Sequence, residues 1–287
     1  MESKDKIILY HANCMDGFGS AFAAYKKFGN SASYIPVRYQ EPLPADLDGK
    51  EVYIVDFSYH EPILKDLESR VKKLVVLDHH KSAETAVKSV SEHRFSSDHS
   101  GAYLSWEYFH PNTLVPRLML LVESGDLFLS DSNTENILTY IYTGGYDFKI
   151  WEQHLADLEK PEKIKQHADT GKAYKTYRDH LVEKILESAQ EVEFEGHRVC
   201  AINGIHELRE FLGTALAERT GLFGIVWYQQ FGHIDVSLRA AGHDKRVDLS
   251  EIAKKYGGGG HCGAAGFRLN VTAQLPWKYV DTLPEKE

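Results

Sequence analysis

The residues best suited to chemistry in this sequence are the triplet Asp78-His79-His80, which directly follows the apolar run 74–77. A carboxylate and two imidazoles are common ligands of divalent metal ions. Because neighbouring side chains on a strand point to opposite faces, the three cannot all bind one ion. The others would bind a second ion, orient a ligand or contact a substrate. Taken alone, the triplet leaves a metal site and a chance pair of surface histidines both open.

Two further apolar runs end in similar residues. The run 7–10 is followed by His11 and then Asp16, and the run 52–55 is followed by Asp56. Strand and helix patterns alternate over the first third of the chain, which predicts a doubly wound parallel sheet covered on both faces. Ligands of such sheets bind outside the carboxyl ends of the strands. Three strands that each end in a carboxylate or an imidazole therefore predict one shared metal site.

The remaining pattern predicts a second, smaller α/β domain after a helical stretch. We expect domains at 1–150 and 191–287, joined by a helical linker at 151–190 that is rich in charged residues. The expected elements are helices at 20–28 and 63–71, strands at 34–39 and 233–239, mostly helix over 100–190, and a helix at 248–256 with a capping box.

Asp126 ends an apolar helical run with the sequence Glu123-Ser124-Gly125-Asp126. Aspartate is common where a helix turns into a loop, so a purely structural role is one interpretation. A further metal ligand is the other interpretation. The position of Asp126 in the sequence does not separate the two.

Four consecutive glycines, at 257–260, precede His261. A flexible linker is the simplest interpretation, but linkers lie in polar sequence, and this run lies among apolar and small residues. Glycines allow backbone N–H groups to approach an anion closely. Arg239, on the polar face of the strand 233–239, and His261 would supply positive charge. The pattern favours a phosphate-binding loop over a linker.

The composition restricts the class of protein. The chain has 287 residues, of which 43% are hydrophobic and 26% charged, as in soluble globular proteins. No apolar run approaches the roughly 18 residues that span a bilayer, and the charged start leads directly into a strand rather than a signal peptide. The net charge of −9 argues against broad binding to long nucleic acid. Three scattered cysteines predict no disulfide framework, so we expect a cytoplasmic location.

Together these residues resemble the DHH/DHHA1 phosphoesterases, a superfamily of nanoRNases, single-strand exonucleases and dinucleotide hydrolases. The resemblance covers nearly the whole chain. The motifs that carry it are His11-Ala12-Asn13-Cys14-Met15-Asp16-Gly17, Val55-Asp56, Asp78-His79-His80, Asp126, Ser237-Leu238-Arg239, Gly257-Gly258-Gly259-Gly260-His261 and Ala264-Ala265-Gly266-Phe267.

The resemblance implies a DHH domain that binds two divalent ions, commonly manganese, and catalyses hydrolysis. Its implied metal ligands are His11, Asp16, Asp56, His79 or His80, and Asp126, with Asp56 as the bridging ligand. Asp78, His79 and His80 are the implied catalytic group, in which the imidazole that does not bind metal orients or protonates near the scissile phosphate. The DHHA1 domain would hold the terminal phosphate or the 3′ nucleotide through Arg239, Gly258, Gly259, Gly260 and His261.

Cys14 is a departure from the family pattern, because many relatives carry a carboxylate at the corresponding place. Cysteine can bind metal, but it is a softer ligand that favours zinc or iron over manganese. Asn13 or water would be alternative ligands. A changed metal preference, a weaker first site and a variant subfamily all remain open.

We therefore expect a metal-dependent phosphodiesterase that converts dinucleotides or very short oligonucleotides, such as linear diguanylate, to 5′-mononucleotides. A phosphatase acting on 3′-phosphoadenosine 5′-phosphate and a catalytically inactive nucleotide sensor are the alternatives. The expected partner is a short nucleotide, without long nucleic acid or membrane, and the sequence does not distinguish a monomer from a homodimer.

Overall fold

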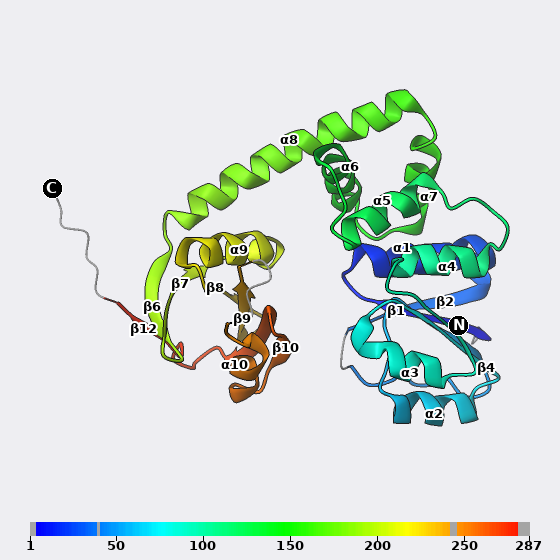
Figure 1. Ribbon diagram of the computed structural model, residues 1–287, viewed down its shortest axis with the longest axis horizontal. Coiled ribbons are helices and arrows are strands. Elements are labelled where there is room, and N and C mark those ends of the chain that lie inside the picture. Colours follow the sequence, from blue (N-terminus) through cyan, green and yellow to red (C-terminus); the bar gives the residue numbers. More distant parts are fainter. Residues whose placement is uncertain (1–3, 39–40, 242–245, 281–287) are drawn as a thin grey trace. The chain divides into compact units, whose positions relative to one another are not determined.

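The computed structural model describes residues 4–38, 41–241 and 246–280, with the side chain of His261 outside the description. It divides into two compact units, Met1–Lys175 and Thr176–Glu287 (Figure 1). The division falls within the long helix α8 (Pro161–Leu186). The expected domain bounds at 150 and 190 stay a prediction.

The first unit is built on a five-stranded parallel sheet in the order β2-β1-β3-β4-β5. Its strands are β1 (Lys6–His11), β2 (Ala32–Val37), β3 (Glu51–Val55), β4 (Lys73–Asp78) and β5 (Glu92–Phe95). The chain runs outward from β1 to β2 in one direction and to β3 in the other, so the order reverses between β1 and β3. The predicted doubly wound parallel sheet is confirmed.

Helices cover both faces of this sheet, as Figure 1 shows. One face packs against α1 (Met15–Phe28), α4 (Gly101–Phe109) and α5 (Arg117–Asp126), and the other packs against α2 (Glu61–Arg70) and α3 (Glu84–Ser89). Tyr53 and Val55 of β3 face the first set, whereas Val52 and Ile54 face the second. Burial on both faces explains why the strands are continuous apolar runs in the sequence.

The middle of the chain is mostly helical, as predicted, but the helical linker expected at 151–190 is not one helix. The middle of the chain contains α6 (Ser132–Thr143), α7 (Phe148–Asp157) and α8, and the chain turns between α7 and α8 at residues 158–160. Pro161 lacks a backbone N–H and has a fixed φ, so it suits the first position of α8. Across the described residues, no helix combines the length and the apolar character that crossing a bilayer requires.

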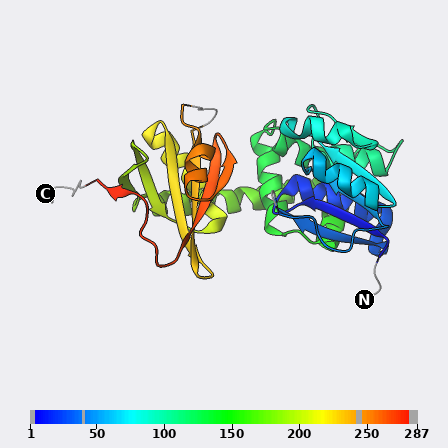
Figure 2. The same ribbon diagram turned by 90° about the horizontal axis from the view of Figure 1, so that it is seen from below.

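The second unit contains a seven-stranded mixed sheet in the order β10-β11-β9-β8-β7-β6-β12. Figure 2 shows the second unit, coloured from yellow-green to red, turned by 90° from the view of Figure 1. Its elements are β6 (Gln190–Phe194), β7 (His197–Asn203), α9 (Arg209–Thr220), β8 (Phe223–Gln230), β9 (His233–Ala240), α10 (Leu249–Lys255), β10 (Gly259–His261), β11 (Ala264–Asn270) and β12 (Lys278–Tyr279). A short 3₁₀ turn lies at His206–Leu208, and two others lie in the first unit, at Gly29–Ser31 and Lys81–Ala83. The second α/β domain is therefore present.

Two local predictions in the second unit have different outcomes. Ile234, Val236 and Leu238 of β9 are buried, as the alternation predicts. At α10, the Asp248 side chain accepts a hydrogen bond from the Ser250 amide at 2.9 Å, which confirms the N-cap. The reciprocal half of the capping box is absent among the described contacts, because Glu251 instead pairs with Lys254.

The second half of the glycine run is part of the sheet, so the run is not a linker. Gly259 and Gly260 belong to β10, which pairs with β11 in antiparallel fashion. A Cβ atom on Gly258 would lie 2.1 Å from the Gly266 carbonyl oxygen, and one on Gly260 would lie 2.5 Å from that of Ala264. Gly260 also has φ of 141°, which side chains disfavour. Close approach of the two backbones therefore requires glycine at these positions.

A pair of buried histidines lies among the helices of the first unit, away from the sheet edge. His154 of α7 and His167 of α8 have ring centroids 5.5 Å apart, and their side chains are almost fully buried. Neither nitrogen of His154 has a hydrogen-bond partner among the described residues. Burial lowers the pKa of both rings, and the nearby Asp157 opposes this shift. Both rings are therefore neutral in the folded protein at neutral pH.

This pair predicts loss of stability in mild acid. The folded pKa values lie below the unfolded value of about 6.5, so the unfolded chain binds more protons and stability falls as the pH drops through that value. We expect the unfolding temperature, followed by circular dichroism from pH 8 to pH 5, to fall less steeply in His154→Leu than in the wild type. His180→Leu, which changes an exposed histidine, is the matched control and should keep the wild-type slope. Equal slopes in all three proteins would contradict the prediction.

Candidate metal centre

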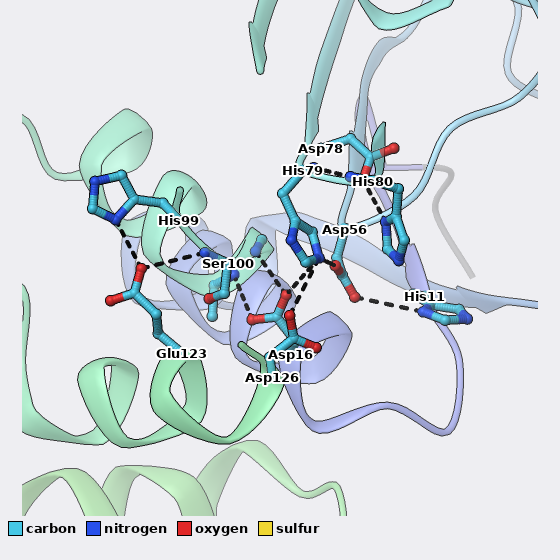
Figure 3. Close-up of polar contacts among 12 residues, drawn as sticks. His11, Asp16, Asp56, Asp78, His79, His80, His99, Ser100, Glu123 and Asp126 are labelled. Atoms are coloured by element: carbon cyan, nitrogen blue, oxygen red, sulfur yellow. Dashed lines mark hydrogen bonds and ion pairs between the residues drawn. The ribbon is translucent and has the colours of Figure 1, made fainter. Parts of the chain in front are cut away.

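Five polar side chains meet where the order of the parallel sheet reverses. His11 is the last residue of β1, Asp56 follows β3, and His79 follows β4. Asp16 lies in the first turn of α1, which begins at Met15 rather than after Gly17 as the sequence suggests. Asp126 is the last residue of α5. Figure 3 shows the five side chains pointing toward one another.

The His79 ring is at the centre of this group. Its Nε2 atom lies 3.3 Å from Asp56 Oδ1, 3.4 Å from Asp126 Oδ2 and 3.6 Å from Asp16 Oδ2. Two ligand atoms bound about 2.1 Å from one ion at right angles would be about 3.0 Å apart. The observed distances are close to that spacing, so the group needs little rearrangement to hold an ion.

Potential ligand atoms form three overlapping groups, in each of which they lie within 4.8 Å of one another. The groups are His11, Cys14 and Asp56; Asp56, His79 and His80; and Asp16, His79 and Asp126. Asp56 belongs to two of them. An arrangement of two neighbouring ion sites that share Asp56 fits these positions.

Several atoms of the group are buried without a hydrogen bond from any described residue. They are both carboxylate oxygens of Asp56, Nε2 of His79 and Nδ1 of His11. The Asp56 side chain is only 1% exposed. An unsatisfied buried charge is costly, and a bound cation removes that cost. The donor set therefore fits divalent metal ions.

The pKa values of the group reflect crowding of carboxylates. Burial, followed by the charges of Asp56 and Asp126, raises the pKa of Asp16. Burial also raises the pKa of Asp126. Burial alone would raise the pKa of Asp56, but contacts with His11 and His79 outweigh it and lower the pKa. A metal ion would displace the protons that this crowding retains.

Asp56 is held in an unusual backbone conformation. Its φ is 62°, in the left-handed region that aspartate tolerates better than most residues. The Asp56 amide donates a hydrogen bond to the Leu77 carbonyl on β4 at 2.9 Å. This bond fixes the turn after β3 and aims the carboxylate at the group.

The N-terminus of α4 holds Asp16. The amides of Gly101 and Ala102 donate to Asp16 Oδ2 and Oδ1 at 2.6 and 2.9 Å (Figure 3). A Cβ atom on Gly101 would lie 2.6 Å from the Asp56 Cβ atom and 2.9 Å from Asp16 Oδ2, so this position requires glycine. The sequence analysis missed Gly101. The only indication of it in the sequence is the preceding Ser100, a residue type that often caps helices. The Ser100 hydroxyl caps α4 by accepting a hydrogen bond from the Tyr103 amide.

Glu123 is a second residue that the sequence analysis missed. Its Oε1 accepts hydrogen bonds from His99 Nδ1 at 2.8 Å and from the Ser100 amide at 3.3 Å. Glu123 precedes Asp126 by three residues on α5, so the two share one helix face. It thereby ties the helix that carries Asp126 to the start of the helix that holds Asp16.

Asp78 and His80 form a pair beside the group. The fully buried Asp78 accepts at Oδ1 from the His79 amide at 2.7 Å, and the same oxygen lies 2.7 Å from His80 Nδ1. This hydrogen bond raises the pKa of His80 to about 9. Asp78 therefore orients the two histidines, and its carboxylate is not in any of the three ligand groups.

The candidate phosphate-binding residues lie in the second unit. Arg239, Gly258, Gly259 and Gly260 line a pocket of about 500 Å³. Arg239 Nη2 pairs with Glu210 at 2.9 Å, and its Nε has no hydrogen-bond partner among the described residues. The Gly258 amide donates to the Ala253 carbonyl and is already used. The side chain of His261 lies outside the described residues.

Comparison with known proteins agrees with this architecture. No family model matches the chain. An uncharacterized protein of Acanthamoeba polyphaga mimivirus is 28% identical over 306 residues, covering 97% of this chain and 72% of that protein. Among solved structures, a pGpG-specific phosphodiesterase, PggH, from Vibrio cholerae superposes with a TM-score of 0.53 at 16% identity, covering 93% of this chain and 94% of PggH.

Exonuclease RecJ bound to manganese superposes with a TM-score of 0.51 at 14% identity, covering 92% of this chain and 86% of RecJ. These structures are DHH-family proteins. The chain has the DHH/DHHA1 phosphoesterase fold. At these identities the comparison establishes the fold alone. The roles of individual residues in the DHH-type site rest on the geometry above and stay predictions.

The close approach of Gly101 to Asp16 and Asp56 predicts a large effect of a single methyl group. Gly101→Ala should weaken binding of Mn²⁺ by about 10- to 100-fold, the usual cost of disturbing residues that position metal ligands. Isothermal titration calorimetry of the metal-free protein measures this effect. Gly263→Ala, whose Cβ atom would enter open space, is the control and should bind Mn²⁺ as the wild type does. Wild-type affinity in folded Gly101→Ala would refute the prediction.

Proposed function

We propose that this protein is a metal-dependent phosphodiesterase that hydrolyses dinucleotides or very short oligonucleotides to 5′-mononucleotides. The observation that carries the proposal is the buried, unsatisfied Asp56 carboxylate between His11 and His79 at the sheet edge. The specificity of PggH for pGpG adds support, and linear diguanylate is therefore a reasonable first substrate.

The proposed ligands divide into two sets that share Asp56. His11 and Asp56 would hold one divalent ion, and Asp16, His79 and Asp126 would hold the second. Asp56, whose Oδ1 lies 3.3 Å from His79 Nε2, would be shared with that second ion. Two Mn²⁺ ions are our starting assignment. Two such ions supply an activated water and neutralise charge on the phosphate during in-line displacement. The proposal takes His79 as the direct ligand, because Nδ1 of His80 is engaged by Asp78.

His80 binds the scissile phosphate in this proposal. Asp78 keeps the ring protonated and fixes its orientation through Nδ1. The ring is 42% exposed, so its other nitrogen, Nε2, is left to donate to a phosphate oxygen. In the same proposal this ring would protonate a leaving oxygen.

The pocket of the second unit is the proposed site for the other end of the substrate. Arg239 would bind a terminal phosphate through its guanidinium, and Arg209 lines the same pocket. Gly259 has open space where a side chain would be, which lets a phosphate reach the backbone. Gly258, Gly260 and His261 complete the proposed binding loop.

The proposed substrate is short because the chain carries a net charge of −9, which disfavours an extended polyanion. We also propose a cytoplasmic location, in keeping with three free cysteines. The protein would act as a monomer or a homodimer.

The direct test is a matrix of metals and substrates. The protein, freed of metal, is incubated with Mn²⁺, Mg²⁺, Co²⁺ or Zn²⁺ and with dinucleotides, longer oligonucleotides or 3′-phosphoadenosine 5′-phosphate. Release of mononucleotides from dinucleotides supports the proposal. Faster hydrolysis of the bisphosphate would make the protein a phosphatase. Tight dinucleotide binding without turnover in any metal would make it a sensor.

Substitution of the shared ligand should abolish turnover. Asp56→Asn removes the charge that both proposed ion sites use, at a cost of several kcal/mol of transition-state stabilisation, so we expect the rate of dinucleotide hydrolysis to fall by about a thousand-fold or more. Chromatographic separation of the nucleotides measures the rate. Asp66→Asn, at an exposed position of α2, should be as active as the wild type. Substantial turnover by Asp56→Asn would argue against the metal assignment.

Substitution in the pocket should affect binding more than turnover. Arg239→Gln removes a charge-assisted hydrogen bond worth about 1.5–3 kcal/mol, so KM should rise by about 10- to 100-fold with a smaller change in kcat. Arg198→Gln, which changes an exposed arginine of the same sheet outside the pocket, should leave both values unchanged. An unaltered KM in Arg239→Gln would exclude Arg239 from substrate binding.

A further inference from the structure

Cys14 lies at the metal centre. It is the residue before α1, between His11 at the end of β1 and Asp16 in the first helical turn. Its Sγ atom lies within 4.8 Å of ligand atoms of both His11 and Asp56, which makes these three residues one group. The neighbouring group of Asp16, His79 and Asp126 offers only nitrogen and oxygen. The two groups therefore differ in chemistry.

We propose that Cys14 binds metal through its sulfur and that the two ion sites of this centre prefer different metals. The site of His11, Cys14 and Asp56 would take Zn²⁺, Co²⁺ or Fe²⁺, because thiolate is a soft ligand. The site of Asp16, His79, Asp126 and the shared Asp56 would take Mn²⁺ or Mg²⁺, because carboxylates suit harder ions. This inference rests on the metal centre of the proposed function and specifies which ions it holds.

The carboxylate of Asp56 is the independent observation that marks this place as a ligand site. It is 1% exposed, and neither oxygen has a hydrogen-bond donor among the described residues. His11 Nδ1 lies 3.5 Å from Asp56 Oδ2 and is likewise without a hydrogen bond in this part of the chain. Sulfur, nitrogen and oxygen donors thus lie together here, and the nitrogen and both oxygens have no hydrogen bond among the described residues.

The surroundings of Cys14 distinguish it from Cys200. Cys200 packs in an apolar cluster of the second unit with Ile202 and Val226. Cys14 belongs to no apolar cluster among the described residues and lies beside carboxylates. Packing therefore does not account for a cysteine here.

Asn13 is a weaker candidate for the same ligand position. It is exposed and has φ of 57°, whereas Cys14 is half-buried. The left-handed turn at Asn13 lies between the end of β1 and the start of α1, where the chain must change direction. Asn13 thus has a conformational role of its own, and the ligand position falls to Cys14.

Cobalt spectroscopy tests the sulfur ligand without any substrate. Metal-free protein is titrated with Co²⁺, and a sulfur-to-cobalt charge-transfer band is followed in the near ultraviolet. We expect the band to saturate at one equivalent in the wild type, to be absent in Cys14→Asp, and to persist in Cys262→Ser, which removes another half-buried cysteine. A wild-type protein that binds two Co²⁺ ions without the band overturns the inference, as does a band that persists in Cys14→Asp.

Calorimetry tests the difference in metal preference. In Cys14→Asp the affinity of one site for Zn²⁺ should fall at least about ten-fold relative to Mn²⁺, while the second site keeps its wild-type preference. Equal preferences of the wild type and Cys14→Asp at both sites would overturn the inference.

Alkylation of the wild-type protein provides a measurement that needs no variant to fold. Zn²⁺ should slow the reaction of Cys14 with iodoacetamide by at least about ten-fold, measured by peptide mass spectrometry, and should leave Cys262 unchanged. No protection of Cys14 by saturating Zn²⁺ would overturn the inference. If the band appears but no metal supports hydrolysis, the proposed function fails and the ligand assignment stands. If the protein hydrolyses dinucleotides but shows no band, the proposed function stands and the assignment of Cys14 as a ligand fails.

Discussion

The site depends on one constraint, which is a carboxylate buried at the edge of a parallel sheet without a hydrogen-bond donor. Asp56 is placed there by β3, by its left-handed backbone and by the hydrogen bond from its amide to Leu77. Burying an ionised carboxylate costs several kcal/mol unless a positive charge lies close by. His11 Nδ1 and His79 Nε2 lie 3.5 and 3.3 Å from the Asp56 oxygens. The neighbouring carboxylates of Asp16 and Asp126 increase the need for positive charge. A bound divalent cation would meet that need.

The sequence predicts the strand-end contributions to this group because they follow from a local rule. In a parallel sheet the carboxyl ends of neighbouring strands lie at one edge, so His11, Asp56 and His79 need only their strands to be recognised. Asp126 comes from a helix, whose direction relative to the sheet is set by packing and not by its own pattern. The role of Gly101 cannot be predicted from the sequence for the same reason, because it depends on the approach of α4 to Asp16 and Asp56, which are distant in sequence.

The glycine run shows the limit of local composition in another way. The composition around the four glycines at 257–260 favours a phosphate-binding loop over a linker, but it gives no sign of the tight edge strand that two of them form. The structure assigns Gly258 and Gly260 a packing reason, because β10 lies close against β11. Because the pairing of β10 with β11 involves no ligand, it explains the glycines at 258 and 260 without any reference to function. Gly257 and Gly259 both have open space where a Cβ atom would lie. Gly257 has φ of 76°, which explains its glycine by conformation, so Gly259 is the glycine whose role phosphate binding would explain best.

A shared ligand also couples the two ion sites. If Asp56 gives one oxygen to each ion, the charge of the first ion lowers the negative charge available to the second, and the effect is reciprocal. A thiolate at Cys14 would add negative charge only to the site of His11, Cys14 and Asp56. It would therefore offset the loss of negative charge more at that site than at the site of Asp16, His79 and Asp126. The affinity of the site at Asp16, His79 and Asp126 for its ion is therefore not set by those residues alone, although their oxygen and nitrogen atoms still decide which metals it prefers. That affinity depends on which ion His11, Cys14 and Asp56 hold, even though Cys14 is in no ligand group with Asp16, His79 and Asp126.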